Sequence, residues 1–223
     1  MRTLLLDTST ERGVIGLAED LTLLHQQVLP ADRRHARDLI PAVNSACEAI
    51  DWKLRTVELL AVGAGPGSYT GLRVGVAAVK ALALTNKASI IALDSLEVVA
   101  CRAGTAPRIC AVADAQQQRI YTAWFRSDEP GMTARTSPTE LHSTEEWLAS
   151  LQPGDVVTGP AVGRWVDRIP PACRIVIEDE RLPNAESLLA LCRREFTAGR
   201  FVDLHGLEPI YLRPSAAEER RPA

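Results

Sequence analysis

The apolar positions at the start of the chain follow first the period of a β-strand and then that of a helix. Three segments have strand character, and turn residues separate them: 2–8, 13–18 and 22–29. Between 35 and 50 the apolar side chains recur at i, i+3, i+4 and i+7, which is typical of one face of an amphipathic helix. The sequence therefore predicts three strands followed by a helix.

Short strands and helices then alternate. A strand over 59–63 runs into a glycine-rich loop, and the helix predicted over 72–85 is apolar nearly all round, so it must be buried on more than one side. A strand over 89–93 and a helix over 95–102 follow, with Asp94 as the N-cap of the helix. Three antiparallel strands followed by alternating helices and strands are typical of the ribonuclease H-like lobe of the actin-like superfamily.

The second half begins in the same way. After a small-residue linker at 103–107, a strand over 108–113 ends at Asp114, and an alternating strand follows over 120–126. Later segments predict a short helix ending at 151 and two strands, at 155–158 and 174–178. A last helix is predicted between Asn184 and Gly199. We therefore expect an α/β protein of two ribonuclease H-like lobes, 1–103 and 104–223, the second a degraded copy of the first.

The loop after the strand at 59–63 has the composition of a phosphate-binding loop without its pattern. Its place between a strand and a helix suits an anion, because helix N-terminal amides favour negative charge. No Gly-x-x-x-x-Gly-Lys-Ser/Thr sequence aligns with it, and after Gly65 and Gly67 a dinucleotide fingerprint would need glycine or alanine where Thr70 stands. A structural turn and a phosphate site both stay open.

Asp7, Thr8 and Ser9 end the first strand. In an actin-like ATPase an aspartate at this position faces the metal and phosphates, whereas the alternative is a strand-end turn held by Asx and serine hydrogen bonds. The matching residue of the second half is Asp114. The residues after it, 115–119, include no glycine, serine or threonine with which to hold a phosphate.

A nucleotide clamp also needs a glycine pair to let adenine approach the backbone, and the nearest candidate is interrupted. Thr158 and Gly159 are followed by Pro160, whose rigid ring stands where the second glycine is needed. One half of the clamp is present and the other is missing. We therefore expect no cofactor on this chain and regard Asp7, Thr8, Ser9 and Asp114 as vestigial.

Neither metal nor thiol chemistry is indicated. Metal-binding relatives of this fold use two histidines at i and i+4, but the position four after His35 is Leu39. The other histidines stand alone at 25, 142 and 205. The five cysteines are odd in number and show no Cys-x-x-Cys spacing, which argues against a disulfide framework or a zinc site: Cys47, Cys101, Cys110, Cys173 and Cys192.

Charge and hydropathy restrict the partners. The formal net charge is -3 and the sequence pI is near 5.9, whereas a protein that mainly neutralises nucleic-acid phosphates is basic, at least locally. We therefore expect another subunit to make most contacts with any RNA. The apolar run at the N-terminus is too short for a signal peptide, and no segment approaches the ~20 apolar residues of a membrane span. We expect a cytoplasmic protein without membrane contact.

The glycine-rich loop resembles the signature of the bacterial TsaB proteins, also called YeaZ, which belong to the Gcp-like group. The resemblance runs from 65 to 75 and rests on Gly65, Pro66, Gly67, Ser68, Tyr69, Thr70, Gly71 and Arg73. Three further segments match in the right order, at 5–10, 35–41 and 208–213. Members of this family are accessory subunits for the synthesis of threonylcarbamoyladenosine in tRNA.

The resemblance implies a paralogue of the catalytic subunit TsaD that has lost catalysis and stays necessary as its partner. It implies a TsaD heterodimer joined by the ATPase TsaE, a homodimer when the chain is alone, and tRNA contact mainly through the complex. ATP and metal are then expected on the partner subunits.

The contact is expected through the first two helices of the N-terminal lobe. Its residues are Ala36, Leu39, Ile40, Val43, Leu72, Gly75, Val76, Ala78, Val79 and Leu82. The alternative is that both helices are covered by their own sheet.

The chain departs from the family pattern in two places. The family commonly has an arginine where Gln116 stands and a glutamate at or near Arg119, and 35–38 replaces its usual His-Ser-Glu. Any partner contact at those positions is open. Two enzyme classes are also kept as alternatives: an ATP-dependent transferase or kinase using Asp7 and Asp114, and, as the weakest, a metallopeptidase.

Overall fold

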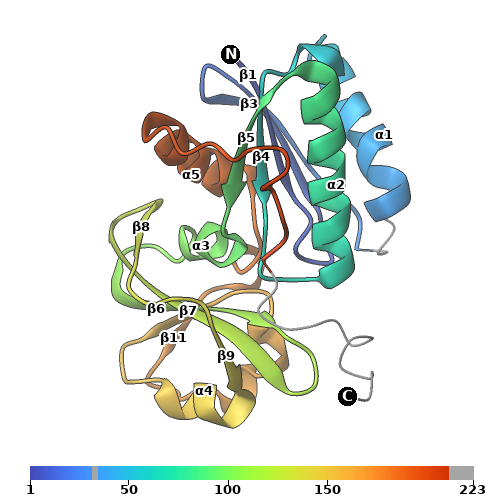
Figure 1. Cartoon of the computed structure of the whole chain (residues 1–223). Helices are drawn as coiled ribbons and strands as arrows, with labels where there is room; N and C mark the ends of the chain where they lie inside the picture. The colour runs from blue at the N-terminus through green and yellow to red at the C-terminus, as the bar shows by residue number, and fades with distance from the viewer. Residues whose placement is uncertain (32–34, 211–223) are drawn as a thin grey trace.

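The first of two β-sheets carries the N-terminal half of the chain. The computed structural model describes residues 1–31 and 35–210 (Figure 1). The strand order is β3-β2-β1-β4-β5, antiparallel among the first three and parallel from β1 to β5. The strand bounds are β1 Arg2–Asp7, β2 Val14–Glu19, β3 Thr22–Val28, β4 Leu59–Gly63 and β5 Ser89–Leu93. Each of these strands lies where the sequence predicts it.

The second sheet repeats this order. Its strands run β8-β7-β6-β10-β11, and β9 also pairs with β7. The pairs among β6, β7 and β8 are antiparallel, and β6, β10 and β11 are parallel, as in the first sheet. Their bounds are β6 Ala106–Asp114, β7 Arg119–Glu129, β8 Met132–Arg135, β9 Glu140–Ser143, β10 Val156–Thr158 and β11 Arg174–Ile175. The predicted fold of two ribonuclease H-like lobes is confirmed.

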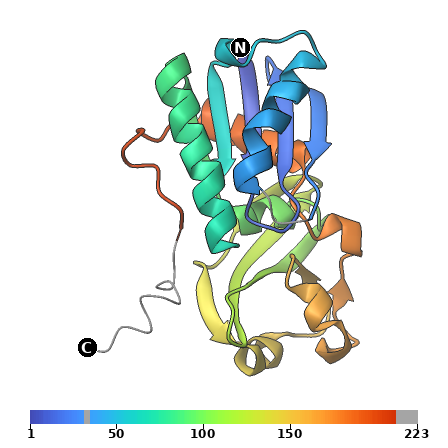
Figure 2. The ribbon, with the colours of Figure 1, turned by 90° about the vertical axis from the view of Figure 1, so that its right-hand side faces the viewer.

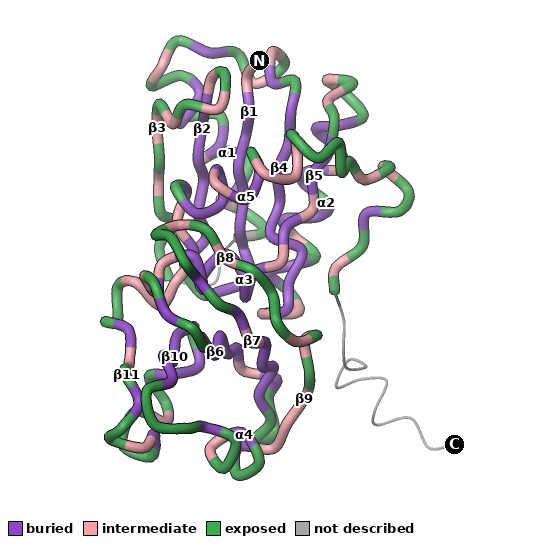
Figure 3. The backbone as a smooth tube through the Cα atoms, turned by 90° about the vertical axis from the view of Figure 1, so that its left-hand side faces the viewer, coloured by how far each residue is buried: buried purple, intermediate pink, exposed green. Residues whose placement is uncertain are grey.

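Helices cover both faces of the first sheet (Figure 2). α1 and α2 pack on the face that carries Leu4 and Leu6, and α5 packs on the face that carries Leu5. The inner strands are therefore buried on both sides, as the purple tube of β1 and β4 shows, while β3 alternates between partly buried and exposed residues (Figure 3). The helix bounds are α1 His35–Glu48, α2 Tyr69–Asn86, α3 Ser95–Ala100, α4 Thr144–Ser150 and α5 Ala185–Thr197, with single 3₁₀ turns at Leu54–Thr56, Val162–Arg164, Val166–Arg168 and Glu178–Glu180.

The last helix of each half packs on the sheet of the other half. α3 follows the first sheet in the chain, but its residues Leu96 and Val99 lie in the core of the second sheet. α5 follows the second sheet, but Leu188 lies in the core of the first. The segment after α5 also returns to the first lobe, since Val202 N donates to Ile90 O at 2.9 Å. The predicted boundary at 103 therefore separates the two sheets but not the helices, because a helical period gives an apolar face without saying which sheet it covers.

Local sequence explains where the helices begin. Ser68 caps α2, and its Oγ accepts from Gly71 N at 3.3 Å, so this helix starts three residues before the predicted 72. The predicted caps of α3 and α5 are confirmed, since Asp94 accepts from Leu96 N at 2.8 Å and Asn184 accepts from Ser187 N at 2.9 Å. Within the described residues, none of the helices combines the length and apolar character that crossing a bilayer requires.

Candidate functional site

The signature loop is bonded to the turn that follows β1. Thr8 Oγ1 donates to Gly71 O at 2.7 Å, and Ser68 N donates to Ser9 O at 2.7 Å. Thr8 is fully buried, and Ser9 nearly so. The first half of the supposed nucleotide clamp is thus a closed contact between two backbone segments.

Three glycines of the signature allow this contact. A Cβ atom on Gly67 would lie less than 3.0 Å from the backbone of Ser9, one on Gly71 less than 3.0 Å from Thr8 O, and one on Gly75 less than 3.0 Å from Thr8 Oγ1. Real Cβ atoms essentially never come so close to another heavy atom. The glycine spacing therefore fits the loop and α2 onto the turn, which favours the structural alternative for this loop over a phosphate site.

The carboxyl group of Asp7 is enclosed by the same elements. It is 0% exposed; Oδ1 accepts from Ser9 N at 2.7 Å, and Oδ2 accepts from Ser95 Oγ at 2.9 Å. Ser95 N in turn donates to Gly65 O at 2.8 Å. Burial raises the pKa of Asp7, and the hydrogen bonds from Ser9 and Ser95 oppose this. Asp7 therefore joins the end of β1 to the start of α3, and a ligand would reach it only if the loop opened.

Asp114 occupies the same place in the second lobe. Its Oδ1 accepts from Gln116 N at 2.8 Å, as Asp7 accepts from Ser9 N. Its other oxygen forms an ion pair with Arg164. Two equivalent Asx turns at the ends of β1 and β6 support the internal duplication that the sequence predicts.

The residues after Asp114 form a left-handed turn and not a phosphate loop. Gln116, Gln117 and Gln118 have φ of 65°, 51° and 58°, and Arg119 N donates to Gln116 O at 3.0 Å. This conformation is uncommon outside glycine, so the turn is strained where an ATPase would place glycine. Gln116, one of the two departures from the family pattern, thus belongs to the turn itself.

A second repeat was not recognised from the sequence. Gly65 after β4 and Gly159 after β10 share a φ of +113°, and each is followed by a proline. A Cβ on Gly159 would lie less than 3.0 Å from the backbone of Val112. Gly159 therefore allows the turn after β10 to pack against β6, and the signal that would have revealed it is the Gly-Pro pair that follows both β4 and β10.

The predicted partner interface lies mostly inside the chain. Of its residues only Ala36 and Ile40 are exposed. The others are buried by the chain's own sheet and helices: Leu39, Val43, Leu72, Gly75, Val76, Ala78, Val79 and Leu82. These side chains leave little exposed area for a partner, because their apolar stripes face the first sheet. The exposed positions of α2 are others, among them Arg73, Ala77 and Leu84.

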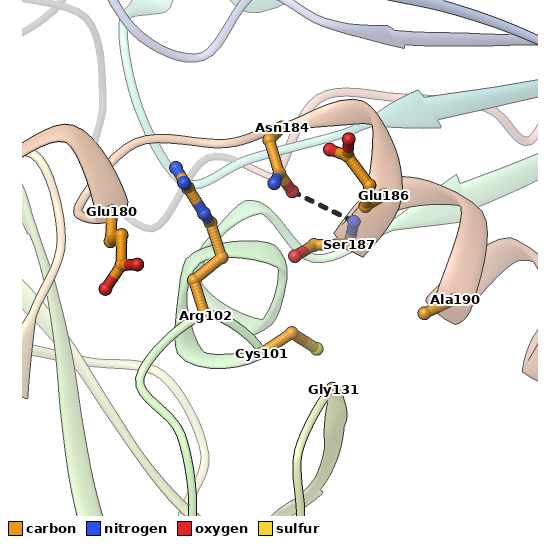
Figure 4. A pocket seen from close by; sticks show the side chains of 8 residues that line it. All are labelled: Cys101, Arg102, Gly131, Glu180, Asn184, Glu186, Ser187 and Ala190. Atoms are coloured by element: carbon orange, nitrogen blue, oxygen red, sulfur yellow. Dashed lines mark hydrogen bonds between the residues drawn. The ribbon is translucent and has the colours of Figure 1, made fainter. Parts of the chain in front are cut away.

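Two hollows mark the surface. One of ≈ 470 Å³ lies between α2 and the segment after α5, lined by Arg73, Val76, Ala77, Lys80, Leu207, Glu208 and Pro209. The other, of ≈ 320 Å³, lies where the lobes meet, with Arg102 pointing between Glu180 and Asn184 (Figure 4). Arg102 Nη1 donates to the carbonyls of Asp179 and Leu182 at 2.6 and 3.0 Å, so its guanidinium fastens the chain leading into α5.

The thiols and histidines form no site in the part of the chain that the structure describes. All five cysteines are buried, and burial raises the pKa of Cys101 to about 11 and that of Cys110 and Cys192 to about 12, so these thiols stay protonated at neutral pH. Residues 1–31 and 35–210 contain no group of three His, Cys, Asp or Glu side chains arranged to hold a metal. The side chain of His35 lies outside the description.

Comparison with known proteins matches these features. Residues 25–146 fit the family model of TsaD, tRNA N6-adenosine threonylcarbamoyltransferase. The chain is 31% identical to the tRNA threonylcarbamoyladenosine biosynthesis protein TsaB of Escherichia coli K12, over 100% of this chain and 99% of that protein, and 27% identical to TsaB of Bacillus subtilis over 99% and 97%. The solved structure of YeaZ from Pseudomonas aeruginosa superposes with a TM-score of 0.80 at 28% identity, covering 95% of this chain and 99% of that one. The chain therefore belongs to the TsaB (YeaZ) family.

Proposed function

We propose that this chain is a non-catalytic subunit required for threonylcarbamoylation of the adenosine next to the anticodon in tRNA. It acts by dimerising with the catalytic subunit TsaD and activating it. Similarity to TsaB proteins over the full length supports the pathway. The match to the TsaD model supports descent from a catalytic relative.

One observation carries the non-catalytic part of the proposal. Both aspartates that an actin-like ATPase would aim at metal and phosphates are engaged within the chain, Asp7 by Ser9 and Ser95 and Asp114 by Gln116 and Arg164. Asp7 is fully buried, so a metal would reach it only after the loop moved, and Arg164 already balances the charge of Asp114. ATP and metal belong on the partner subunits in this proposal, TsaE joins the complex, and tRNA is contacted mainly through it.

The partner surface of this proposal is the exposed side of α1 and α2. Ile40 is 43% exposed and Leu84 is 67% exposed, and the small residues Ala36, Ala77 and Ala81 are exposed on the same two helices. Exposed apolar residues on two packed helices are a common basis for protein contact. The same surface serves the homodimer that we propose for the isolated chain.

The decisive experiment measures the modified nucleoside in cells depleted of this chain. Plasmid copies of the wild type and of Asp114→Asn are compared, since asparagine keeps the bond to Gln116 N but removes the charge. We expect modification to fall on depletion and to be restored fully by both copies, as judged by mass spectrometry of digested tRNA. A folded Asp114→Asn chain that binds TsaD but fails to restore modification would show that Asp114 is catalytic.

A binding experiment tests the same proposal without a partner. We expect titration calorimetry of the purified chain with ATP and magnesium to show no binding, because neither lobe holds an open phosphate loop. Micromolar binding would favour the alternative of an ATP-dependent transferase.

A further inference from the structure

The two lobes share one buried helix. All six residues of α3 are buried, and its apolar side chains divide between two cores. Leu96 and Val99 pack with the second sheet, whereas Val98 and Cys101 pack with α5 in the first lobe. A movement of one lobe against the other would uncover one side of this helix.

A charged group fixes α3 to α5 and β8. Arg194 of α5 grips Glu97 of α3 with two hydrogen bonds, Nη1 to Oε1 at 2.7 Å and Nη2 to Oε2 at 3.1 Å. Arg194 Nη1 also donates to Thr133 O of β8 at 3.3 Å, and Thr133 Oγ1 donates to Glu97 Oε1 at 3.1 Å. Glu97 is 7% exposed, whereas the side chain of Arg194 is 38% exposed, so it is the carboxylate of this pair that is withdrawn from water.

Further polar contacts join α3 and the residues that follow it to the second lobe. Arg135 of β8 pairs with Asp94, the N-cap of α3, at 2.6 Å. Arg174 of β11 donates through Nη2 to Ala103 O at 2.7 Å, just after α3. The linker between the two sheets is thus held at both ends.

We propose that Glu97, Arg194 and Thr133 form a lock that holds the two lobes at one angle, so that the chain does not hinge. Lobes joined only by linkers and a small polar interface move relative to each other by default. Here a change of angle requires that a bidentate ion pair separate, leaving the buried carboxylate of Glu97 without a charged partner. The chain therefore presents both lobes to any partner as one rigid body.

Distance measurements between two spin labels test the lock. The labels are placed at Lys53→Cys in the first lobe and Ala149→Cys on α4 in the second, both at exposed positions. The five native cysteines are at most 9% exposed, so they compete little for the label. We expect one narrow distance distribution in the unmodified background and a distribution at least twice as wide in Arg194→Lys, which keeps the charge but loses the fork.

The matched control is a second bidentate arginine–carboxylate pair, which lies inside one lobe. Arg108 contacts Asp155 through Nε at 2.7 Å and Nη2 at 3.2 Å, and Asp155 is almost fully buried. Arg108→Lys should leave the distance distribution narrow, as should Asp155→Asn, whereas Glu97→Gln should broaden it as Arg194→Lys does.

Three results would overturn the proposal. The first is a broad or two-peaked distance distribution in the labelled chain that carries no further substitution. The second is an unchanged width in Arg194→Lys or Glu97→Gln when circular dichroism shows a folded chain. The third is equal broadening in Arg108→Lys, which would indicate general loosening instead of a hinge.

Discussion

At the scale of single residues, the signature is a packing device. Gly67, Gly71 and Gly75 each face the turn formed by Thr8 and Ser9, and none has room for a Cβ atom. A motif that looks like a phosphate loop is thus selected here by contact between two backbone segments. The lesson is that glycine spacing alone does not distinguish a ligand cradle from a close backbone contact.

Replacing Gly71 by alanine should destabilise the chain. The new Cβ meets Thr8 O, a backbone atom that cannot turn aside as a side chain can, so overpacking outweighs the better helix propensity of alanine. We expect a loss of about 2–3 kcal/mol in the free energy of unfolding, measured by urea denaturation. Gly163→Ala is the control, because its nearest atom is the end of Arg181 at 4.0 Å. Equal effects of the two changes would contradict the packing explanation.

The buried carboxyl of Asp7 should make stability depend on pH in a definite direction. Its pKa is raised in the folded chain, so folding favours the protonated form, and this contribution is full below pH about 4 and is lost as pH rises through the folded pKa. The variant Asp7→Asn cannot ionise, and its amide group can still form hydrogen bonds with Ser9 N and Ser95 Oγ. Its free energy of unfolding should exceed that of the wild type by a margin that grows above pH 4.

Urea denaturation at several pH values measures this margin. The contributions of other titrating groups to the pH dependence cancel in this difference, because both chains carry the same groups. A difference in the free energy of unfolding that is constant with pH, or that shrinks as pH rises, would mean that burial does not govern the pKa of Asp7.

At the scale of elements, the local sequence predicts where each helix lies along the chain but not which sheet it packs against. The apolar residues all round α2 predict burial on more than one side, and the chain itself buries Leu72, Val79 and Leu82. The exposed apolar residue is Leu84, which periodicity did not single out.

Association with TsaD should depend on the exposed residues of α1 and α2. We expect Ile40→Asp or Leu84→Asp to lower the affinity by at least tenfold, because a carboxylate would be buried in the contact. Ile177→Asp in the second lobe is the control, since Ile177 is 64% exposed against 67% for Leu84. Calorimetry of folded variants measures the effect. If both variants bind TsaD as the wild type does, the contact lies elsewhere on the chain.

The sequence predicted most of the fold and less of the site. Strand patterns and caps located the five strands of the first sheet and all five helices, and they also located β6, β7, β10 and β11 of the second sheet. β8 and β9 were missed, since each has only four residues, none of them fully buried, and no alternation of buried and exposed positions. Asp7 and Asp114 were correctly placed at strand ends, but their bonds to Ser95 and Arg164 join residues far apart in the chain and leave no local pattern.

At the scale of the whole molecule, the halves are not independent units. The face of the first sheet that carries Leu5 is covered by α5, more than 180 residues later in the chain. A fragment ending at 103 would expose that face to water. It would also expose the side of α3 that packs in the core of the second sheet.

Fragment 1–103 should therefore fail to fold by itself, although the linker at 103–107 resembles a domain boundary. We expect the isolated fragment to show no cooperative thermal transition and to bind a hydrophobic dye. The full chain should unfold in one transition, followed by circular dichroism. A fragment with its own sharp transition would contradict the dependence on α5.

The reciprocal placement of α3 and α5 bears on why the second half of the chain is retained. Each half lends its final helix to the other, as two subunits do after a domain swap, here within a single polypeptide. Loss of the second half would take with it the cover of the first. Selection for a stable N-terminal surface is then enough to preserve the second half as well.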